Sequence, residues 1–249
     1  MSFPGEKVFQ LTRPVKYVFQ ESNENSSFLV VVFSAFHGKE SEGKPPTYNY
    51  INTLGGCKHN KIFILDDCEG SVCYYTGKNR DFSLESSVVA LIVSIANERG
   101  IPMENVILCG SSKGGYAALY YGIKYSFGAV ISGGPQTFMG NYLSSVSSFT
   151  RALIEFIAGD SGEESVEYLN RLIFDQIENK ISFPEIYIHV GRGDHHYEGH
   201  VKPLMHALDA QGASYELDLA EYDDHGALAN YFQGFLLGTL EQVVRSRSV

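Results

Sequence analysis

Short runs of apolar residues alternate along the chain with segments in which apolar residues recur every three or four positions. Continuous apolar runs are typical of strands buried on both faces of a sheet, and the wider spacing is typical of helices that bury one face. The sequence predicts an edge hairpin at 7–11 and 15–20 and further strands at 28–36, 61–65, 106–109, 129–132, 185–190 and 214–220. It predicts helices at 84–96, 116–123, 201–211 and 226–245. This alternation favours an α/β fold with a mostly parallel sheet and helices on both faces.

Residues from about 135 to 180 interrupt this alternation. They contain no strand-like run and predict two or three amphipathic helices. Such helices would form an insertion after the sixth strand, where they could act as a lid. Since no repeat or linker divides the chain, we expect residues 1–249 to form a single domain with this helical insertion.

The composition narrows the function classes. The formal net charge of −10 argues against non-specific binding of nucleic acid, which requires a basic surface. No apolar run has the length of a membrane span, and the first residues lack the apolar core of a secretory signal. The four cysteines form no CxxC pair, so we expect reduced thiols and a cytoplasmic protein. The composition does not indicate an oligomeric state.

A glycine-rich turn joins the predicted strand at 106–109 to the next helix. Its sequence, Gly110-Ser111-Ser112-Lys113-Gly114, has the form G-x-S-x-G. Between a strand and a helix, this motif forms a tight turn that exposes a nucleophilic serine and directs the following backbone N–H at a developing oxyanion. Taken alone, the motif also fits a glycine-rich turn whose serine caps the helix. In this context it predicts Ser112 as nucleophile and the Lys113 N–H as an oxyanion-hole donor.

An aspartate and a histidine follow the last two predicted strands. Asp194 comes first and His225 second, so the order Ser, Asp, His is that of the α/β-hydrolase fold. The carboxyl ends of parallel strands meet at one edge of the sheet, where the histidine can take the serine proton and the carboxylate can fix its tautomer. We therefore predict an α/β-hydrolase fold with the triad Ser112, Asp194 and His225. Asp223 or Asp224 could replace Asp194 as the acid, but their adjacency to His225 gives poor geometry.

The loop after the strand at 28–36 is expected to supply the second oxyanion donor, from the backbone N–H of Ala35 or Phe36. His37 follows and is either a substrate-binding residue or a surface histidine. The Lys113 side chain could attract an anionic substrate or pair with a nearby carboxylate. Tyr75 could offer an aromatic surface to the substrate or pack in the core.

Several histidines surround the predicted acid. His195 and His196 could line the rim of the pocket or be solvated. His196 and His200 would share a helical face, so that a metal site with Asp194 is conceivable. No separate set of carboxylates and histidines completes the ligands, and Asp194 already has a role in the triad. We therefore predict no metal.

Three segments carry a more specific resemblance. Phe33–Phe36 (FSAF), Tyr48–Ile51 (YNYI) and Gly110–Gly115 (GSSKGG) are similar to segments of α/β-hydrolase-fold proteins from bacterial capsule and surface-glycan clusters. The chain resembles capsular polysaccharide O-acetyltransferases of the meningococcal serogroup A type and, more distantly, accessory-secretion proteins that O-acetylate serine-rich adhesins. The similarity runs from about residue 28 to the end of the chain.

This resemblance implies that acetyl-CoA acts as a co-substrate rather than as a bound cofactor. It implies an acetyl-Ser112 intermediate and transfer to a sugar hydroxyl. Ser112, Asp194 and His225 match the family's triad, and the loop Ser34–Phe36 matches its oxyanion region.

Three functions follow from these observations. The first is serine-dependent O-acetylation of a bacterial capsular or surface polysaccharide. The second is hydrolysis of a carboxylic ester by the same triad with water as acceptor, because the triad serves both reactions. The third is a non-catalytic binding or scaffold protein with this fold, against which an intact triad argues.

Overall fold

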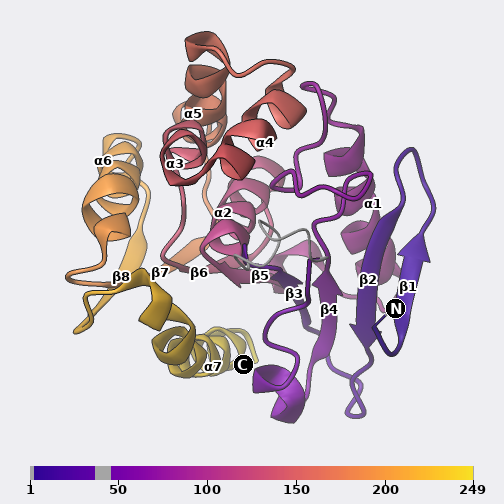
Figure 1. The fold of residues 1–249 in the computed structure, drawn as a ribbon. Coiled ribbons are helices and arrows are strands. Elements are labelled where there is room, and N and C mark those ends of the chain that lie inside the picture. Colours follow the sequence, from indigo (N-terminus) through magenta and orange to yellow (C-terminus); the bar gives the residue numbers. More distant parts are fainter. Residues whose placement is uncertain (1–2, 37–45, 249) are drawn as a thin grey trace.

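The computed structural model of the protein describes residues 3–36 and 46–248, in which a central sheet is covered by helices (Figure 1). The strands are β1 (Glu6–Phe9), β2 (Val15–Gln20), β3 (Leu29–Phe33), β4 (Asn60–Ile64), β5 (Val106–Ser111), β6 (Ala129–Gly133), β7 (Glu185–Gly191) and β8 (Tyr215–Ala220). The α-helices are α1 (Ser83–Glu98), α2 (Lys113–Tyr125), α3 (Met139–Val146), α4 (Ser148–Ala158), α5 (Glu163–Glu178), α6 (Lys202–Ala210) and α7 (Leu228–Arg247).

The strand order in the sheet is β1-β2-β4-β3-β5-β6-β7-β8. β1 and β2 form an antiparallel hairpin at one edge, and β2 is also antiparallel to β4. All neighbouring strands from β4 to β8 are parallel. The predicted edge hairpin and mostly parallel sheet are thus confirmed, and the carboxyl ends of β5, β7 and β8 lie at the same edge.

Each face of the sheet has its own apolar core. Val31 and Phe33 of β3 pack with the buried residues of α1 to α6, whereas Val30 and Val32 pack on the other face with Phe232 of α7. The continuous apolar run of β3 follows from this arrangement, because alternate side chains point to opposite faces and both faces are covered. Figure 1 shows α7 on the face opposite α2.

The segment between β6 and β7 contains three helices, α3, α4 and α5, as the absence of strand-like runs predicted. The turn between α3 and α4 is fixed by a capping box, in which Ser147 accepts the Thr150 N–H and the Thr150 hydroxyl accepts the Ser147 N–H. α5 then returns the chain to β7, which pairs in parallel with β6.

Several element boundaries differ from the sequence prediction, and local contacts account for two of them. The strand expected to continue to residue 36 ends at Phe33, because the Ser34 N–H donates to the Tyr75 hydroxyl at 2.6 Å. The last helix begins at Leu228, because His225–Ala227 forms a 3₁₀ turn before it. Within the described ranges, no helix combines the length and the hydropathy needed to cross a bilayer.

Candidate active site

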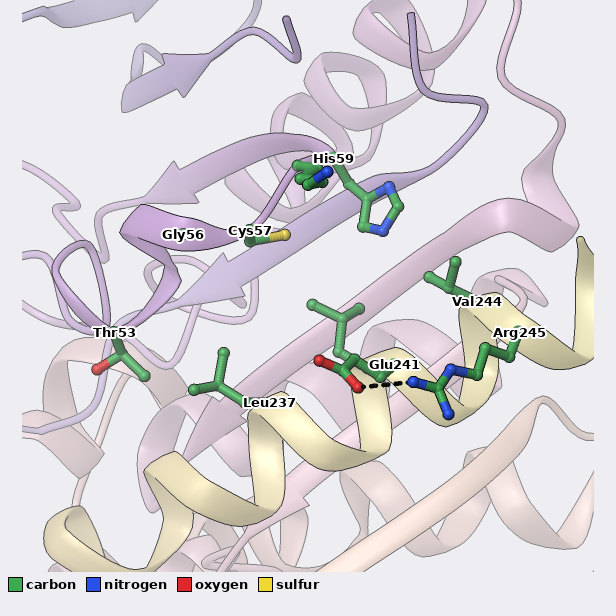
Figure 2. A pocket seen from close by; sticks show the side chains of 10 residues that line it. Thr53, Gly56, Cys57, His59, Leu237, Glu241, Val244 and Arg245 are labelled. Atoms are coloured by element: carbon green, nitrogen blue, oxygen red, sulfur yellow. Dashed lines mark hydrogen bonds and ion pairs between the residues drawn. The ribbon is translucent and has the colours of Figure 1, made fainter. Parts of the chain in front are cut away.

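A cavity of about 450 Å³ lies beside the amino-terminal end of β4, opposite the edge where the predicted catalytic residues gather (Figure 2). Figure 2 shows Cys57 and His59, which precede β4, across from the α7 residues Leu237 and Val244. The described lining of this cavity includes none of the predicted site residues. The predicted catalytic residues lie away from this cavity, at the other edge of the sheet.

The turn between β5 and α2 holds Ser112 in a strained backbone conformation, with φ 53° and ψ −118°. Only glycine fits two residues before Ser112 and two residues after it. A Cβ on Gly110 would lie 2.5 Å from the Gly114 carbonyl, and a Cβ on Gly114 would lie 2.3 Å from the Phe33 carbonyl oxygen. The Ser112 N–H donates to the Gly133 carbonyl of β6 at 2.7 Å, which anchors the turn to the sheet. A left-handed φ at a non-glycine residue costs free energy, so the surrounding contacts must hold it.

The three predicted triad residues meet at this edge. The Oγ of Ser112 lies 3.1 Å from Nε2 of His225, and Nδ1 of His225 lies 2.8 Å from Oδ2 of Asp194. Ser112 is 8% exposed and the His225 side chain 21%, so both can be reached from solvent, whereas the Asp194 side chain is fully buried. This chain of contacts allows His225 to accept the serine proton while Asp194 holds the opposite ring nitrogen.

Asp194 is held as a carboxylate. Its Oδ1 accepts the backbone N–H of His196 at 2.9 Å. Burial by itself would raise the pKa of Asp194, but the hydrogen bonds from His225 and from the His196 N–H lower this pKa below its ordinary value. An ionised Asp194 can accept a hydrogen bond from Nδ1 of His225, which keeps the proton on that ring nitrogen.

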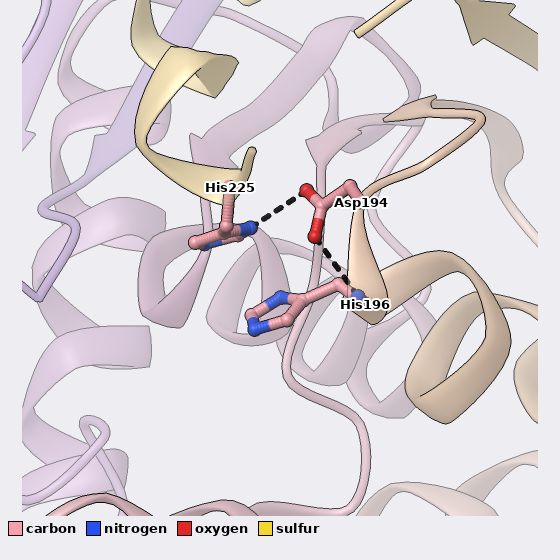
Figure 3. A group of neighbouring side chains, drawn as sticks. All are labelled: Asp194, His196 and His225. Carbon is pink, nitrogen blue, oxygen red and sulfur yellow. Dashed lines mark hydrogen bonds and ion pairs between the residues drawn. The ribbon is translucent and has the colours of Figure 1, made fainter. Parts of the chain in front are cut away.

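The three neighbouring histidines have different environments. His196 is buried and packs against the His225 ring, with 3.6 Å between ring centroids (Figure 3). Its Nδ1 contacts the Gly134 carbonyl at 3.0 Å, which assigns the proton to that nitrogen. Burial lowers the pKa of His196 to about 3 and that of His200 to about 4, so both are neutral at physiological pH. The His195 side chain is 70% exposed at the rim.

Asp194, His196 and His225 also place possible metal-ligand atoms within 4.8 Å of one another (Figure 3). This set differs from the one the sequence suggested, since His225 replaces His200. The hydrogen bond between Asp194 and His225 needs a proton on Nδ1, which a metal at that atom would displace. The 2.8 Å contact between Nδ1 of His225 and Oδ2 of Asp194 fits this hydrogen bond.

The side chain of Lys113 does not point toward a substrate. Its Nζ lies 2.7 Å from Oδ2 of Asp66, and both side chains are fully buried. The expectation that this cation contacts an anionic substrate is therefore corrected, and pairing with a carboxylate is the outcome. The Lys113 N–H remains in the first turn of α2, where backbone N–H groups have no partner within the helix.

Two other expectations need correction. Tyr75 is buried in the core, where its hydroxyl donates to the Ile64 carbonyl at 2.9 Å, so it cannot contact a substrate. The Ala35 N–H donates to Oδ1 of Asn49 at 2.8 Å, which leaves Phe36 as the candidate for the second oxyanion donor. His37 lies outside the described residues.

A cavity of about 500 Å³ opens on Ser112 and His225. Ala35, Phe36, Asn49 and Tyr50 line it. The other lining residues come from the nucleophile turn, the α3–α4 region and the start of α7: Ser111, Tyr142, Val146, Ser147, Thr150, Gly226, Leu228 and Ala229. The described lining contains no lysine or arginine.

Sequence reasoning missed Gln136, which is fully buried and lies between β6 and α3. Its Nε2 donates to Oγ of Ser112 at 2.8 Å. It also missed the role of Asp66 as the partner of Lys113. Both residues follow the carboxyl end of a strand. This position was the one feature of the sequence that could have indicated a place near Ser112.

Comparison with solved structures supports the description of the fold. The capsule O-acetyltransferase of Neisseria meningitidis serogroup A superimposes with a TM-score of 0.79 at 19% identity, covering 97% of this chain and 96% of that one. The glycosylation-associated protein complex Gap123 of Streptococcus agalactiae gives 0.78 at 18% identity, over 95% of this chain but 46% of the other. S-formylglutathione hydrolase of Staphylococcus aureus gives 0.67 at 13% identity, covering 96% and 97%.

No family model matches the sequence. No curated protein matches it by sequence either. At these identities the structural likeness establishes the fold and no more. The chain has the α/β-hydrolase fold that the order of Ser112, Asp194 and His225 predicted.

Proposed function

We propose that the protein is a serine acyltransferase that works through an acyl-Ser112 intermediate. The observation that carries this proposal is the chain of contacts from Ser112 through His225 to Asp194, placed at a strained turn that opens on a cavity. A turn that served only to cap α2 would not need a histidine and a buried carboxylate in series with its serine.

In the acylation step, Oγ of Ser112 attacks the carbonyl carbon of the donor and its proton passes to Nε2 of His225. The oxyanion forms near the Lys113 and Phe36 N–H groups, which we assign as its donors. The leaving group takes the proton from His225 as the bond to the carbonyl carbon breaks. Asp194 stabilises the imidazolium that exists between these two transfers.

In the second step, an acceptor hydroxyl gives its proton to His225 and attacks the acyl carbon. The bond to Oγ breaks, and Oγ recovers a proton from His225. Water and a sugar hydroxyl can both perform this attack, and the acceptor is selected by the walls of the cavity. Tyr142 and Ser147 contribute hydroxyl-bearing side chains to the lining, which suits a polyol acceptor.

The proposal in its finer form is O-acetylation of a bacterial capsular or surface polysaccharide in the cytoplasm, with acetyl-CoA as the donor. It is supported by the likeness to the meningococcal capsule O-acetyltransferase over nearly the whole chain, and by the structure of a histidine variant of that protein in complex with CoA. A cytoplasmic site agrees with the four free cysteines.

Ester hydrolysis is the second candidate. Hydrolases share the fold, and the described lining of the cavity offers no cation to a CoA phosphate. Incubation with acetyl-CoA, with and without a mixture of bacterial polysaccharides, separates the two. Release of CoA that depends on the glycan supports the transferase, whereas turnover of simple acetyl esters alone supports the esterase.

Ser112→Ala is expected to abolish both activities without changing the thermal unfolding midpoint by more than a few degrees. A fluorophosphonate probe should label the wild-type protein and not this variant. Failure of the probe to label folded wild-type protein would instead favour a binding or scaffold role.

A further inference from the structure

Ser112 has a second partner besides the histidine base. Nε2 of Gln136 donates to the serine Oγ at 2.8 Å, and Oε1 of Gln136 accepts the Tyr74 hydroxyl at 2.6 Å. Gln136 and Tyr74 are both fully buried. The hydrogen-bonded chain Tyr74–Gln136–Ser112 thus reaches the nucleophile from inside the protein, on a different side from His225.

The orientation of the Gln136 amide is set by its neighbours. Burial raises the pKa of Tyr74 well above its ordinary value, so the phenol keeps its proton and can donate to the amide oxygen. Burial also raises the pKa of the nearby Tyr142 phenol, and the Gln136 side chain opposes part of that rise. With its oxygen engaged by Tyr74, the amide presents its nitrogen to Ser112.

Tyr74 is itself fixed in place. Its backbone N–H donates to Oδ2 of Asp66 at 2.9 Å, and its φ of 55° lies in the left-handed region. The same carboxylate holds Lys113, the residue after the nucleophile. The phenol that orients Gln136 and the turn that carries Ser112 therefore share one buried anchor.

We propose that Gln136 is a further catalytic residue, which holds the serine Oγ and directs its hydrogen at His225; this inference rests on the proposed role of Ser112. A serine hydroxyl has one hydrogen and two lone pairs. With a Gln136 N–H on one lone pair, the serine proton is free for Nε2 of His225 at 3.1 Å.

The same N–H assists when the acyl-enzyme breaks down. As the acceptor oxygen bonds to the acyl carbon, the C–Oγ bond breaks and its electron pair remains on Oγ, which then takes the proton held by His225. Negative charge grows on Oγ before that proton arrives. Hydrogen bonds to a charged oxygen are stronger than those to a neutral one, so Gln136 stabilises this transition state more than the resting enzyme.

Gln136 is not among the residues that line the cavity. Its loss should therefore lower the rate of reaction and leave the binding of the substrate or probe unchanged. A purely structural role would instead change thermal stability or affinity.

The test is the rate of fluorophosphonate labelling at increasing probe concentration. Gln136→Met keeps the size of the side chain and removes the donor. We expect its limiting labelling rate to fall several-fold to about tenfold, the range for loss of one neutral hydrogen bond, with an unchanged half-saturating concentration. Tyr74→Phe leaves Gln136 in place and frees its amide to rotate, so a smaller loss in the same direction is expected. Gln242→Met, an exposed glutamine on α7, is the matched control and should label like wild type.

The outcomes separate the two proposals. If wild-type protein is not labelled, the proposed function fails. If wild-type protein is labelled and Gln136→Met reacts at the same limiting rate, the role of Gln136 is wrong. Should Gln136→Met fail to fold, Tyr74→Phe decides: a wild-type limiting rate in that variant overturns the inference, and a reduced rate with unchanged half-saturation supports it.

Discussion

The buried ion pair beside the nucleophile gives a sharp stability prediction. Lys113 and Asp66 are both fully buried, with Nζ and Oδ2 2.7 Å apart. The two sides of the pair are supported unequally. Asp66 also accepts backbone N–H groups from the turn at Cys73, Tyr74 and Tyr75, at 2.9 to 3.2 Å. Lys113 has in addition the face of the Tyr75 ring, 5.1 Å from Nζ to the centroid.

This asymmetry predicts unequal costs. Lys113→Met leaves the Asp66 carboxylate with its backbone donors, so we expect a loss of about 1–3 kcal/mol in the free energy of unfolding, the cost of one charged hydrogen bond. Asp66→Asn leaves the Lys113 ammonium buried without a counter-ion, and its new amide hydrogens face the same backbone donors. Removing one partner of a buried pair in this way costs about 3–5 kcal/mol. In the double variant no charge remains, so its loss should be smaller than the sum of the two single losses by about 2 kcal/mol or more.

Urea unfolding at pH 7, followed by circular dichroism, measures all three variants against wild type. The reasoning would be refuted if the two single variants lost the same free energy of unfolding, or if Lys113→Met lost more. Either result would mean that the backbone donors do not stabilise the unpaired Asp66 carboxylate. Additive losses in the double variant would show that the pair does not couple Asp66 to the nucleophile turn.

Two further predictions concern the triad and the neighbouring histidines. Asp194→Asn should lower the acylation rate by about 10⁴-fold, as for other neutralised triad acids, whereas Asp224→Asn should stay within a few-fold of wild type in the same labelling assay; the reverse result would identify Asp224 as the acid. His196 and His200 have pKa values lowered to about 3 and 4, so below about pH 6.5 the unfolded chain binds more protons than the folded one. The free energy of unfolding should therefore fall with decreasing pH, by up to about 1.4 kcal/mol per pH unit for each histidine. Urea titrations at pH 7 and pH 5 should show a shallower decline for His196→Phe than for wild type, and an identical decline would contradict the assignment.

The positions of the strands along the chain were predicted well, because the periodicity of apolar residues indicates which faces are buried. Once strands and helices alternate, the ends of β5, β7 and β8 have to meet. That rule is why Ser112, Asp194 and His225 could be brought together from positions up to 113 residues apart. The α/β-hydrolase fold is confirmed by the structural comparisons, and the catalytic roles remain proposals.

Side-chain partners across loops could not be predicted in the same way. The direction of the Lys113 side chain depends on Asp66, 47 residues earlier, and no periodic pattern links the two. The Ala35 N–H is taken by the side-chain amide of Asn49, 14 residues later, and no periodic pattern links these two residues either. Gln136 is one polar residue in a short connection, so its contact with the nucleophile becomes visible only when the strands are assembled.

The part of the cavity lining that the α3–α4 region supplies has a consequence for how the proposed activity could be altered. Val146 and Ser147 reach the cavity from a turn fixed by its own capping box, whereas Ser112 and His225 are held by the strand ends. Substitutions in that turn can reshape the space offered to an acyl group or an acceptor without disturbing the proton path. Under the proposed function, the groups that react and the residues that select the acceptor thus belong to separate stretches of the chain.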